Sequence, residues 1–340
     1  VPRREGHDKL DFNDLACLMG LDEVAGQVMN APKPGPLPEA GRTLHVLTIG
    51  ELLEMDIPPR GHVLYPVIPT QGLAMLHAMR GIGKTFAALQ MAYAVASGGT
   101  AFTRWRAEKP LKVLYIDGEM PMSSMQERLA RITQAAGTEP QEDFFRIITP
   151  DIQPDFIMPN LATREGQALV APYVEDADFI VVDNLATLMR TGKSNDEDTW
   201  APVQEWILSL RRRGKSALLV HHESKNGSQR GTIAKEDALD TVIRLSRPAD
   251  YEAAQGARFK VQLLKARGVF GNEAEPFEAA LAPDGSWQVT GIDEAEEEHL
   301  RELAASGLSV RDIAEEMDIS KSSVSRRCKK YGIKLRAGLR

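Results

Sequence analysis

The sequence has little cysteine and no long apolar run. Its 340 residues include two cysteines, Cys17 and Cys328, which lie far apart and in no metal-ligand spacing. This excludes a disulfide framework and a cysteine-based zinc cluster, and it favours a reducing compartment. No apolar segment approaches the roughly 20 residues of a membrane-spanning helix, and the first residues lack the apolar core of a signal peptide. We therefore expect a cytoplasmic protein with no membrane partner.

Positive charge is scarce except at one end of the chain. The formal net charge is −7, which by itself argues against a nucleic-acid partner. Residues 319–340, however, contain eight lysines and arginines and no acidic residue, which leaves −15 for the rest. This asymmetry directs the search for nucleic-acid binding to the basic end.

The length is enough for about two domains, and a 43% hydrophobic composition supplies a core. The proline-dense segment 32–38 indicates a stiff linker. Before it, residues 11–29 predict either a short helical arm or a frayed terminus. We predict an N-terminal arm and linker over 1–40, an α/β domain over 41–291 and a small all-α domain over 292–340.

Short apolar runs alternate with amphipathic segments after residue 72, which predicts an α/β fold with a mostly parallel sheet covered on both faces. The predicted strands of this part are 73–77, 113–116, 144–148, 179–182 and 217–221, and the predicted helices are 85–97, 123–136, 163–174 and 196–212. From residue 238 strand follows strand, which predicts antiparallel strands that extend the sheet. These strands are 238–245, 257–264, 277–281 and 287–289.

The strongest motif is Ala-Met-Arg-Gly-Ile-Gly-Lys-Thr at residues 78–85, between a predicted strand and a predicted helix. This is the P-loop arrangement, in which backbone N–H groups cradle phosphates, Lys84 reaches the β and γ oxygens and Thr85 binds Mg²⁺. It departs from the usual pattern only in having Ala78 at the first glycine position. We therefore predict ATP and Mg²⁺ as cofactors. The predicted nucleotide-binding residues are Ala78, Met79, Arg80, Gly81, Ile82, Gly83, Lys84, Thr85, Phe86 and Asp183.

Acidic residues follow two further strands of the predicted sheet. Asp183 ends the run Phe-Ile-Val-Val-Asp and, beside the P-loop, would hold Mg²⁺ together with Thr85. Glu119 follows another strand and could orient the attacking water, a role for which Asp117 is the alternative unless it only forms the turn. A fourth strand ends at His221 and His222, which point to opposite faces and so make a poor metal pair. A polar group at that tip could instead sense the γ-phosphate.

These four strand ends, in this order, resemble the RecA-like ATPase fold, and most closely the RepA subgroup of plasmid replicative hexameric helicases, over about residues 60–282. The resemblance implies a catalytic carboxylate at Glu119, the Walker-B role for Asp183 and a sensor at His221 or His222, of which we select His221. Lys265-Ala-Arg267 is similar to the fingers that DnaB-like helicases insert into the neighbouring subunit's site. The resemblance thus implies self-association as a hexamer, while a solvated strand end is the alternative for Lys265 and Arg267.

Two loops, 189–195 and 225–232, mix glycine, small polar and basic residues. Such loops suit contact with the phosphate backbone of single-stranded DNA without base readout, here through Lys225 and Arg230. Ordinary surface loops are the alternative.

The basic end predicts a helix from about residue 293 to 304, a second helix capped by Ser309 and a third over 321–331 capped by Ser320. This pattern resembles the helix-turn-helix of resolvases, invertases and small transcription regulators, whose last helix lies in the major groove of duplex DNA. A helical protein-interaction module is the alternative. The predicted DNA-binding residues are Lys321, Ser322, Ser323, Ser325 and Arg326 at base edges, and Arg327, Lys329 and Lys330 at phosphates.

These features together predict an oligomeric, ATP-hydrolysing DNA-binding motor, specifically a replicative helicase of a plasmid, phage or integrated element. Two alternatives stay open, a recombination mediator without unwinding activity and a DNA-binding regulator switched by ATP.

Overall fold

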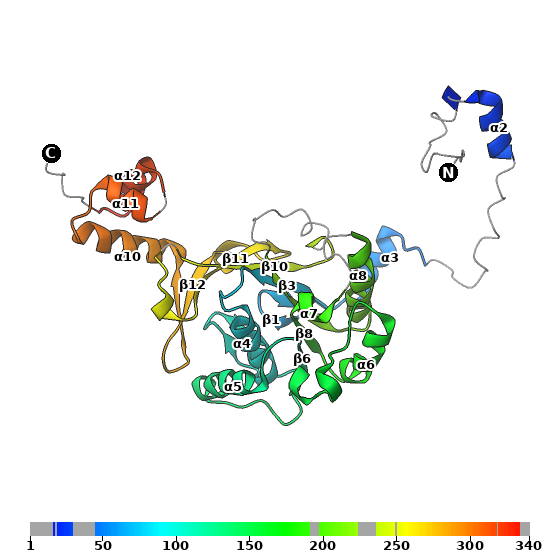
Figure 1. Cartoon of the computed structure of the whole chain (residues 1–340), viewed down its shortest axis with the longest axis horizontal. Coiled ribbons are helices and arrows are strands. Elements are labelled where there is room, and N and C mark those ends of the chain that lie inside the picture. Colours follow the sequence, from blue (N-terminus) through cyan, green and yellow to red (C-terminus); the bar gives the residue numbers. More distant parts are fainter. Residues whose placement is uncertain are drawn as a thin grey trace. The chain divides into compact units, whose positions relative to one another are not determined.

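The structure is a computed structural model that describes residues 16–17, 19–29, 45–190, 197–223, 236–248, 250–317 and 319–333 (Figure 1). The chain divides into two units, Val1–Pro58 and Pro59–Arg340. The first contains α2 (Leu21–Met29), within the predicted arm, and α3 (Ile49–Glu54). Thr48 and Glu51 form a capping box at the start of α3, because each side chain accepts a hydrogen bond from the other's backbone N–H.

The second unit is built on a nine-stranded sheet with the order β13-β12-β11-β10-β3-β9-β8-β6-β7. The six strands from β10 to β7 are parallel, and β11 to β13 continue the sheet as an antiparallel meander. The strands are β3 (Leu73–Ala78), β6 (Val113–Asp117), β7 (Phe145–Ile148), β8 (Phe179–Asp183), β9 (Ser216–His222), β10 (Thr241–Ser246), β11 (Arg258–Ala266), β12 (Phe277–Leu281) and β13 (Trp287–Gly291).

One prediction about the sheet is wrong. We expected every strand after residue 238 to be antiparallel, but β10 pairs parallel with β3, with Arg244 opposite His77. The chain between β9 and β10 is long enough to run back to the end of the sheet where the parallel strands begin, as a connection between parallel strands requires. The antiparallel pairs of this sheet are those of β10 with β11, β11 with β12 and β12 with β13.

Helices cover both faces of the sheet, as predicted. Alternate residues of each strand point to opposite faces, so Leu76 packs in the core beneath α4 and α5, and Met75 packs in the core beneath α6 and α8. These helices are α4 (Lys84–Ser97), α5 (Met122–Ala136), α6 (Arg164–Glu175) and α8 (Glu197–Arg212).

Several short elements were not predicted, because two- or three-residue strands leave no periodic signal. They are β1 (His62–Leu64), β2 (Ile68–Pro69), β4 (Thr100–Ala101), β5 (Trp105–Arg106) and α7 (Leu185–Leu188), with 3-10 turns at Pro150–Ile152, Pro154–Phe156, Ala253–Gln255 and Gly271–Glu273. The β4–β5 hairpin contributes Phe102 and Trp105 to an aromatic cluster with Phe277 and Trp287 of the meander. This cluster ties the antiparallel strands to the core.

Three helices follow the last strand: α10 (Ile292–Ala305), α11 (Val310–Glu316) and α12 (Lys321–Lys330). Ser309 caps α11 in a box with Asp312, and Ser320 caps α12 by accepting the backbone N–H of Ser323. The helices share a small apolar core of their own. Its buried members are Leu300, Ile313, Ala314, Met317, Val324 and Cys328.

Candidate active site

The parallel strands bring the predicted polar residues to one edge of the sheet. Asp117 at the end of β6 stands opposite Asp183 at the end of β8, and Ala78 at the end of β3 stands opposite His222 at the end of β9. Because all four strands run in the same direction, their carboxyl ends form a single row. This is the edge where α/β sheets bind their ligands.

The P-loop connects β3 to the first turn of α4. Gly81 and Gly83 have φ values of +78° and +111°, which only glycine adopts easily. Lys84 is buried, and its Nζ donates to the carbonyl of Ala78 at 2.9 Å and to that of Met79 at 2.7 Å. Burial lowers the pKa of Lys84 to about 8, although Asp183 and the neighbouring glutamates oppose the shift. The ammonium is therefore poorly solvated and would gain from a phosphate partner.

Asp183 lies buried beside the P-loop. The hydroxyl of Tyr115 donates to its Oδ2 at 2.7 Å. Burial raises the pKa of Asp183, while hydrogen bonds from Tyr115 and Thr85 oppose that rise. A carboxylate and a hydroxyl within hydrogen-bond reach of each other form the oxygen-only donor set that Mg²⁺ prefers, so Asp183 and Thr85 fit a Mg²⁺ ion held jointly with phosphates.

Glu119 and Asp117 occupy different environments. Glu119 is 61% exposed, and its Oε2 accepts the side-chain amide of Asn184 at 2.6 Å. Asp117 is buried and its Oδ2 accepts the backbone N–H groups of Met120 at 2.9 Å and Glu119 at 3.3 Å. Burial raises the pKa of Asp117 to about 7. Asp117 therefore builds the turn that presents Glu119.

Of the two adjacent histidines, His222 lies next to Glu119, with 3.9 Å between Nε2 and Oε2. Burial lowers the pKa of His222, and the charge on Lys84 lowers it further. Adjacent residues of a strand point to opposite faces, so the two imidazoles lie apart. The one beside Glu119 is that of His222, whereas we selected His221 from the sequence.

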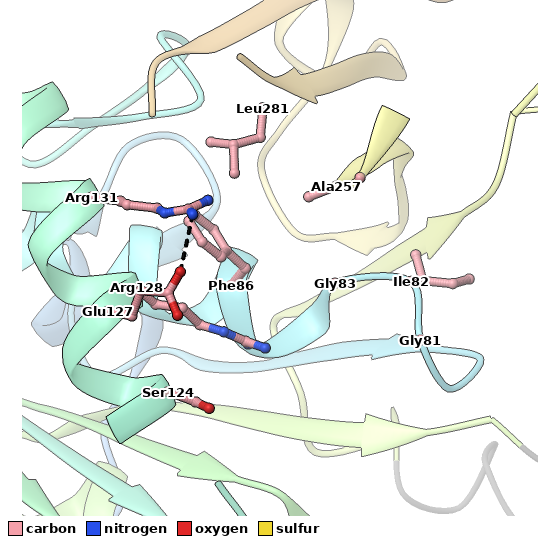
Figure 2. Close-up of a pocket in the computed structure, with 11 residues that line it drawn as sticks. Gly81, Ile82, Gly83, Phe86, Ser124, Glu127, Arg128, Arg131, Ala257 and Leu281 are labelled. Atoms are coloured by element: carbon pink, nitrogen blue, oxygen red, sulfur yellow. Dashed lines mark hydrogen bonds and ion pairs between the residues drawn. The ribbon is translucent and has the colours of Figure 1, made fainter. Parts of the chain in front are cut away.

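A cavity of about 370 Å³ opens beside the P-loop (Figure 2). Phe86 of α4 and Arg131 of α5 face Ala257 and Leu281 across it. Its lining combines apolar surface with two arginines, of which Arg131 pairs with Glu127 at 3.0 Å. The lining residues are Gly81, Ile82, Gly83, Phe86, Ser124, Glu127, Arg128, Arg131, Gly256, Ala257 and Leu281.

Lys265 and Arg267 lie at the opposite edge of the sheet, because β11 runs antiparallel to β10 and pairs Ala266 with Thr241. The Nζ of Lys265 donates to the carbonyl of Glu236 at 2.7 Å. Arg267 is 57% exposed, and its guanidinium lies 3.9 Å from Asp240. Within one chain, neither side chain meets the P-loop.

The predicted DNA-binding residues of α12 differ in their surroundings. Ser323 is partly buried at the helix cap, where its hydroxyl lies 2.9 Å from that of Ser320. Arg327 is partly buried and pairs with Glu296 of α10 at 3.3 Å. The exposed residues are Lys321, Ser322, Ser325, Arg326, Lys329 and Lys330. Lys225 and Arg230 lie outside the described residues.

Sequence reasoning missed Tyr115, Asn184 and Arg247, which touch the site. Tyr115 shares a strand face with Asp117, and Asn184 directly follows Asp183, so the strand period and the chain order contained a signal for both. Asn184 also caps α7 by accepting the backbone N–H groups of Ala186 and Thr187. Arg247 had no local signal.

The sheet, the P-loop and the acidic strand ends define a RecA-like P-loop ATPase. The chain belongs to the AAA domain family, whose profile matches residues 38–228. That match ends just after β9, so the antiparallel strands and α10 to α12 lie beyond it. No curated protein matches the chain. One similar structure is that of a KaiC-like protein, PH0186, from the hyperthermophilic archaeon Pyrococcus horikoshii OT3. It is 17% identical with a TM-score of 0.44, over 65% of this chain and 90% of that one.

Within the described ranges, no helix combines the length and apolarity needed to cross a bilayer.

Proposed function

We propose that the chain is an oligomeric ATP-hydrolysing motor that acts on DNA, a replicative helicase of the RepA type from a plasmid, phage or integrated element. The observation that carries this proposal is the convergence of Lys84, Asp183 and Glu119 at one sheet edge, in a chain whose last described helix, α12, is basic. A predicted helix-turn-helix domain over 292–340 would attach the motor to duplex DNA.

Each residue of the site has a definite task in this proposal. Lys84 would exchange the carbonyls of Ala78 and Met79 for β- and γ-phosphate oxygens, which relieves its poor solvation. Bound Mg²⁺, held by Thr85 and Asp183, would neutralise phosphate charge. Glu119 would accept a hydrogen bond from the attacking water through Oε1, because the amide of Asn184 already donates to Oε2.

The cavity beside the P-loop suits the nucleoside part of ATP. Phe86, Ala257 and Leu281 offer apolar surface for a flat base, and the cavity begins at the loop that would hold the phosphates. Arg128 reaches into this space from α5 (Figure 2) and could contact the ribose or the phosphates.

Lys265 and Arg267 would act on the ATP of a neighbouring subunit. They lie at the sheet edge opposite their own P-loop, so a head-to-tail ring would bring them to the next chain's site. Asp240 is already paired with Arg60 at 3.3 Å and with Arg211, so it can release Arg267 at little cost. A finger at this position would stabilise the charge that builds on the transferred phosphoryl group.

The helix α12 favours duplex binding by the last domain. Lys321, Ser322 and Arg326 are exposed on its first turns, where a recognition helix contacts base edges. Lys329 and Lys330 follow on its last turn, near the reach of phosphates.

Strand displacement on forked DNA tests the helicase proposal. We expect ATP-dependent displacement by the wild type, none by Lys84→Ala, and none by Arg267→Ala despite retained ATP binding. Mixing the two inactive variants should restore some activity, because a subunit with Arg267 can serve a neighbour with an intact Lys84. Site-specific, ATP-dependent duplex binding without displacement would favour the regulator, and DNA-dependent filaments without displacement would favour the recombination mediator.

A further inference from the structure

Arg247 lies next to the P-loop although it belongs to none of the motifs above. Because β10 runs parallel to β3, the chain that leaves β10 emerges beside the loop that leaves β3. The Nη2 of Arg247 donates to the carbonyl of Gly81 at 2.5 Å, and its Nη1 donates to the carbonyl of Arg258 at 3.0 Å. Its guanidinium carbon also lies 3.6 Å from the centroid of the Tyr251 ring. Its Nη1 also donates to the carbonyl of Gly256 at 3.3 Å, so one side chain joins the P-loop to the first residue of β11 and to the segment that precedes it.

That segment forms one wall of the cavity, through Gly256 and Ala257. Independent bonds fix the wall in place. The hydroxyl of Tyr251 donates to the carbonyl of Gly256 at 2.9 Å, and Arg258 pairs with Asp250 at 2.8 Å. Residues 256–258 are therefore fixed in position, and Arg247 can hold the P-loop against them.

The P-loop itself is also packed against the beginning of β11. A Cβ added to Gly83 would lie 3.4 Å from the ring of Phe259, the second residue of β11. Phe259 is fully buried in the core. The loop thus lies close to the beginning of β11 at two points, Gly81 and Gly83.

A P-loop binds phosphate because its successive N–H groups converge inwards, so some of its carbonyls must turn outwards and need donors elsewhere. Arginine suits this task because its planar fork serves two carbonyls at once and stacks on an aromatic ring. A charged donor also makes a stronger bond to a carbonyl than a neutral one does.

We propose that Arg247 is a positioning residue of the nucleotide site. It holds the Gly81 carbonyl outward, keeps the P-loop N–H groups aimed inward, and sets the width of the cavity by tying the loop to the Gly256–Arg258 wall. This inference rests on the proposed nucleotide binding. Arg247 would raise the affinity for ATP and ADP, and would leave the hydrolytic step to Glu119 and Asp183.

The test compares Arg247→Gln and Arg247→Lys with the wild type and with a matched control, Arg213→Gln. Arg213 pairs with the exposed Glu175 away from the cavity, so the control removes the same charge without touching the loop. The measurements are the Kd of ADP by calorimetry, the KM and kcat for ATP, and the thermal unfolding midpoint.

We expect Arg247→Gln to raise the Kd and KM by about tenfold or more, with kcat changed less than about threefold. Arg247→Lys should raise the Kd by at least about threefold, because one ammonium cannot span both carbonyls. If Arg247→Gln fails to fold, the change in Kd of Arg247→Lys is the test. Arg213→Gln should behave as the wild type.

Wild-type ADP affinity in folded Arg247→Gln or Arg247→Lys would overturn the inference and leave the proposed function standing. An equal loss in Arg213→Gln, or a fall in kcat as large as the rise in KM, would also overturn it. Failure of the wild type to bind ADP or ATP would instead overturn the proposed function, and the inference with it.

Discussion

Replacing Tyr115 with phenylalanine removes one buried hydroxyl from the candidate Mg²⁺ site and little else. The ring of Tyr115 stacks on Phe145, with centroids 6.2 Å apart and planes 18° apart, and phenylalanine retains this contact. The lost hydrogen bond is the 2.7 Å donation to Asp183. Because a bond to an ionised group contributes about 1.5–3 kcal/mol, we expect the free energy of unfolding near neutral pH to fall by about that amount.

The same change should weaken Mg²⁺ binding in a pH-dependent manner. Burial already raises the pKa of Asp183, and the Tyr115 hydrogen bond holds it down. Without the hydroxyl the pKa rises further, so protons compete better with Mg²⁺ for this carboxylate. The Mg²⁺ concentration that gives half the maximal ATPase rate should therefore rise at pH 6.5, by at most about tenfold for each unit by which the pKa rises. The increase should be smaller at pH 8.5, where more of the carboxylate is ionised in both proteins.

The assay is a Mg²⁺ titration of ATP hydrolysis at the two pH values, with Tyr93→Phe as the control. The Tyr93 hydroxyl also makes a 2.7 Å bond, to the carbonyl of Thr138, and its ring also contacts Phe145. An unchanged Mg²⁺ requirement in Tyr115→Phe at both pH values would refute a role of this hydroxyl at the Mg²⁺ site. An equal increase in Tyr93→Phe would refute it as well, because that bond is remote from the metal ligands.

Three further predictions concern the P-loop and the last helices. ATP affinity should fall as the pH rises above about 8, because burial lowers the pKa of Lys84 to about 8 and the phosphates bind its ammonium form. Calorimetry at pH 9 in buffers of different ionisation heat should show that a proton is taken up when ATP binds. Binding without proton uptake would contradict this prediction. Ser320→Ala removes the N-cap of α12 and should destabilise the C-terminal helices by about 1 kcal/mol. A thermal melt followed by circular dichroism measures this, and an unchanged melt would show that the cap does not stabilise the helix. Lys329→Ala should weaken duplex binding and flatten its log–log salt dependence by about 0.9, because Lys329 is exposed and assigned to a phosphate. Arg327→Ala should do so less, because Arg327 pairs with Glu296. Equal losses in a fluorescence anisotropy titration would argue against this docking.

The parallel core could be predicted closely from the sequence. The strands at 73–78, 113–117, 179–183 and 216–222 are short, mostly apolar runs between amphipathic helices, and each observed bound lies within one residue of the predicted one. The direction of β10 could not be predicted, since the sequence of a six-residue strand carries no sign of its orientation. The β4–β5 hairpin was not predicted for a different reason. Its residues are held by packing among Phe102, Trp105 and Phe277, which leaves no local pattern in the sequence.

The order of the strand ends predicted the main components of the candidate site, but not the contacts between them. The amide of Asn184 reaches Glu119 across 65 positions of the chain, and Arg247 reaches Gly81 across 166. Such pairs depend on the three-dimensional register of the strands, which no local spacing encodes. The pairing of Arg327 with Glu296 could not be predicted either, because the sequence of a basic helix does not show which of its faces packs against a neighbouring helix.

Glu119 is proposed to act on ATP held by the P-loop, and the variant Glu119→Gln tests this role. Glutamine has nearly the same shape and can keep the contact with Asn184, but it cannot act as a base. Steady-state hydrolysis should fall by about 10²–10⁴-fold, while the Kd of ATP measured with the same protein stays within about twofold of the wild type. Wild-type turnover in Glu119→Gln would contradict the account, and so would a wild-type protein that binds no ATP.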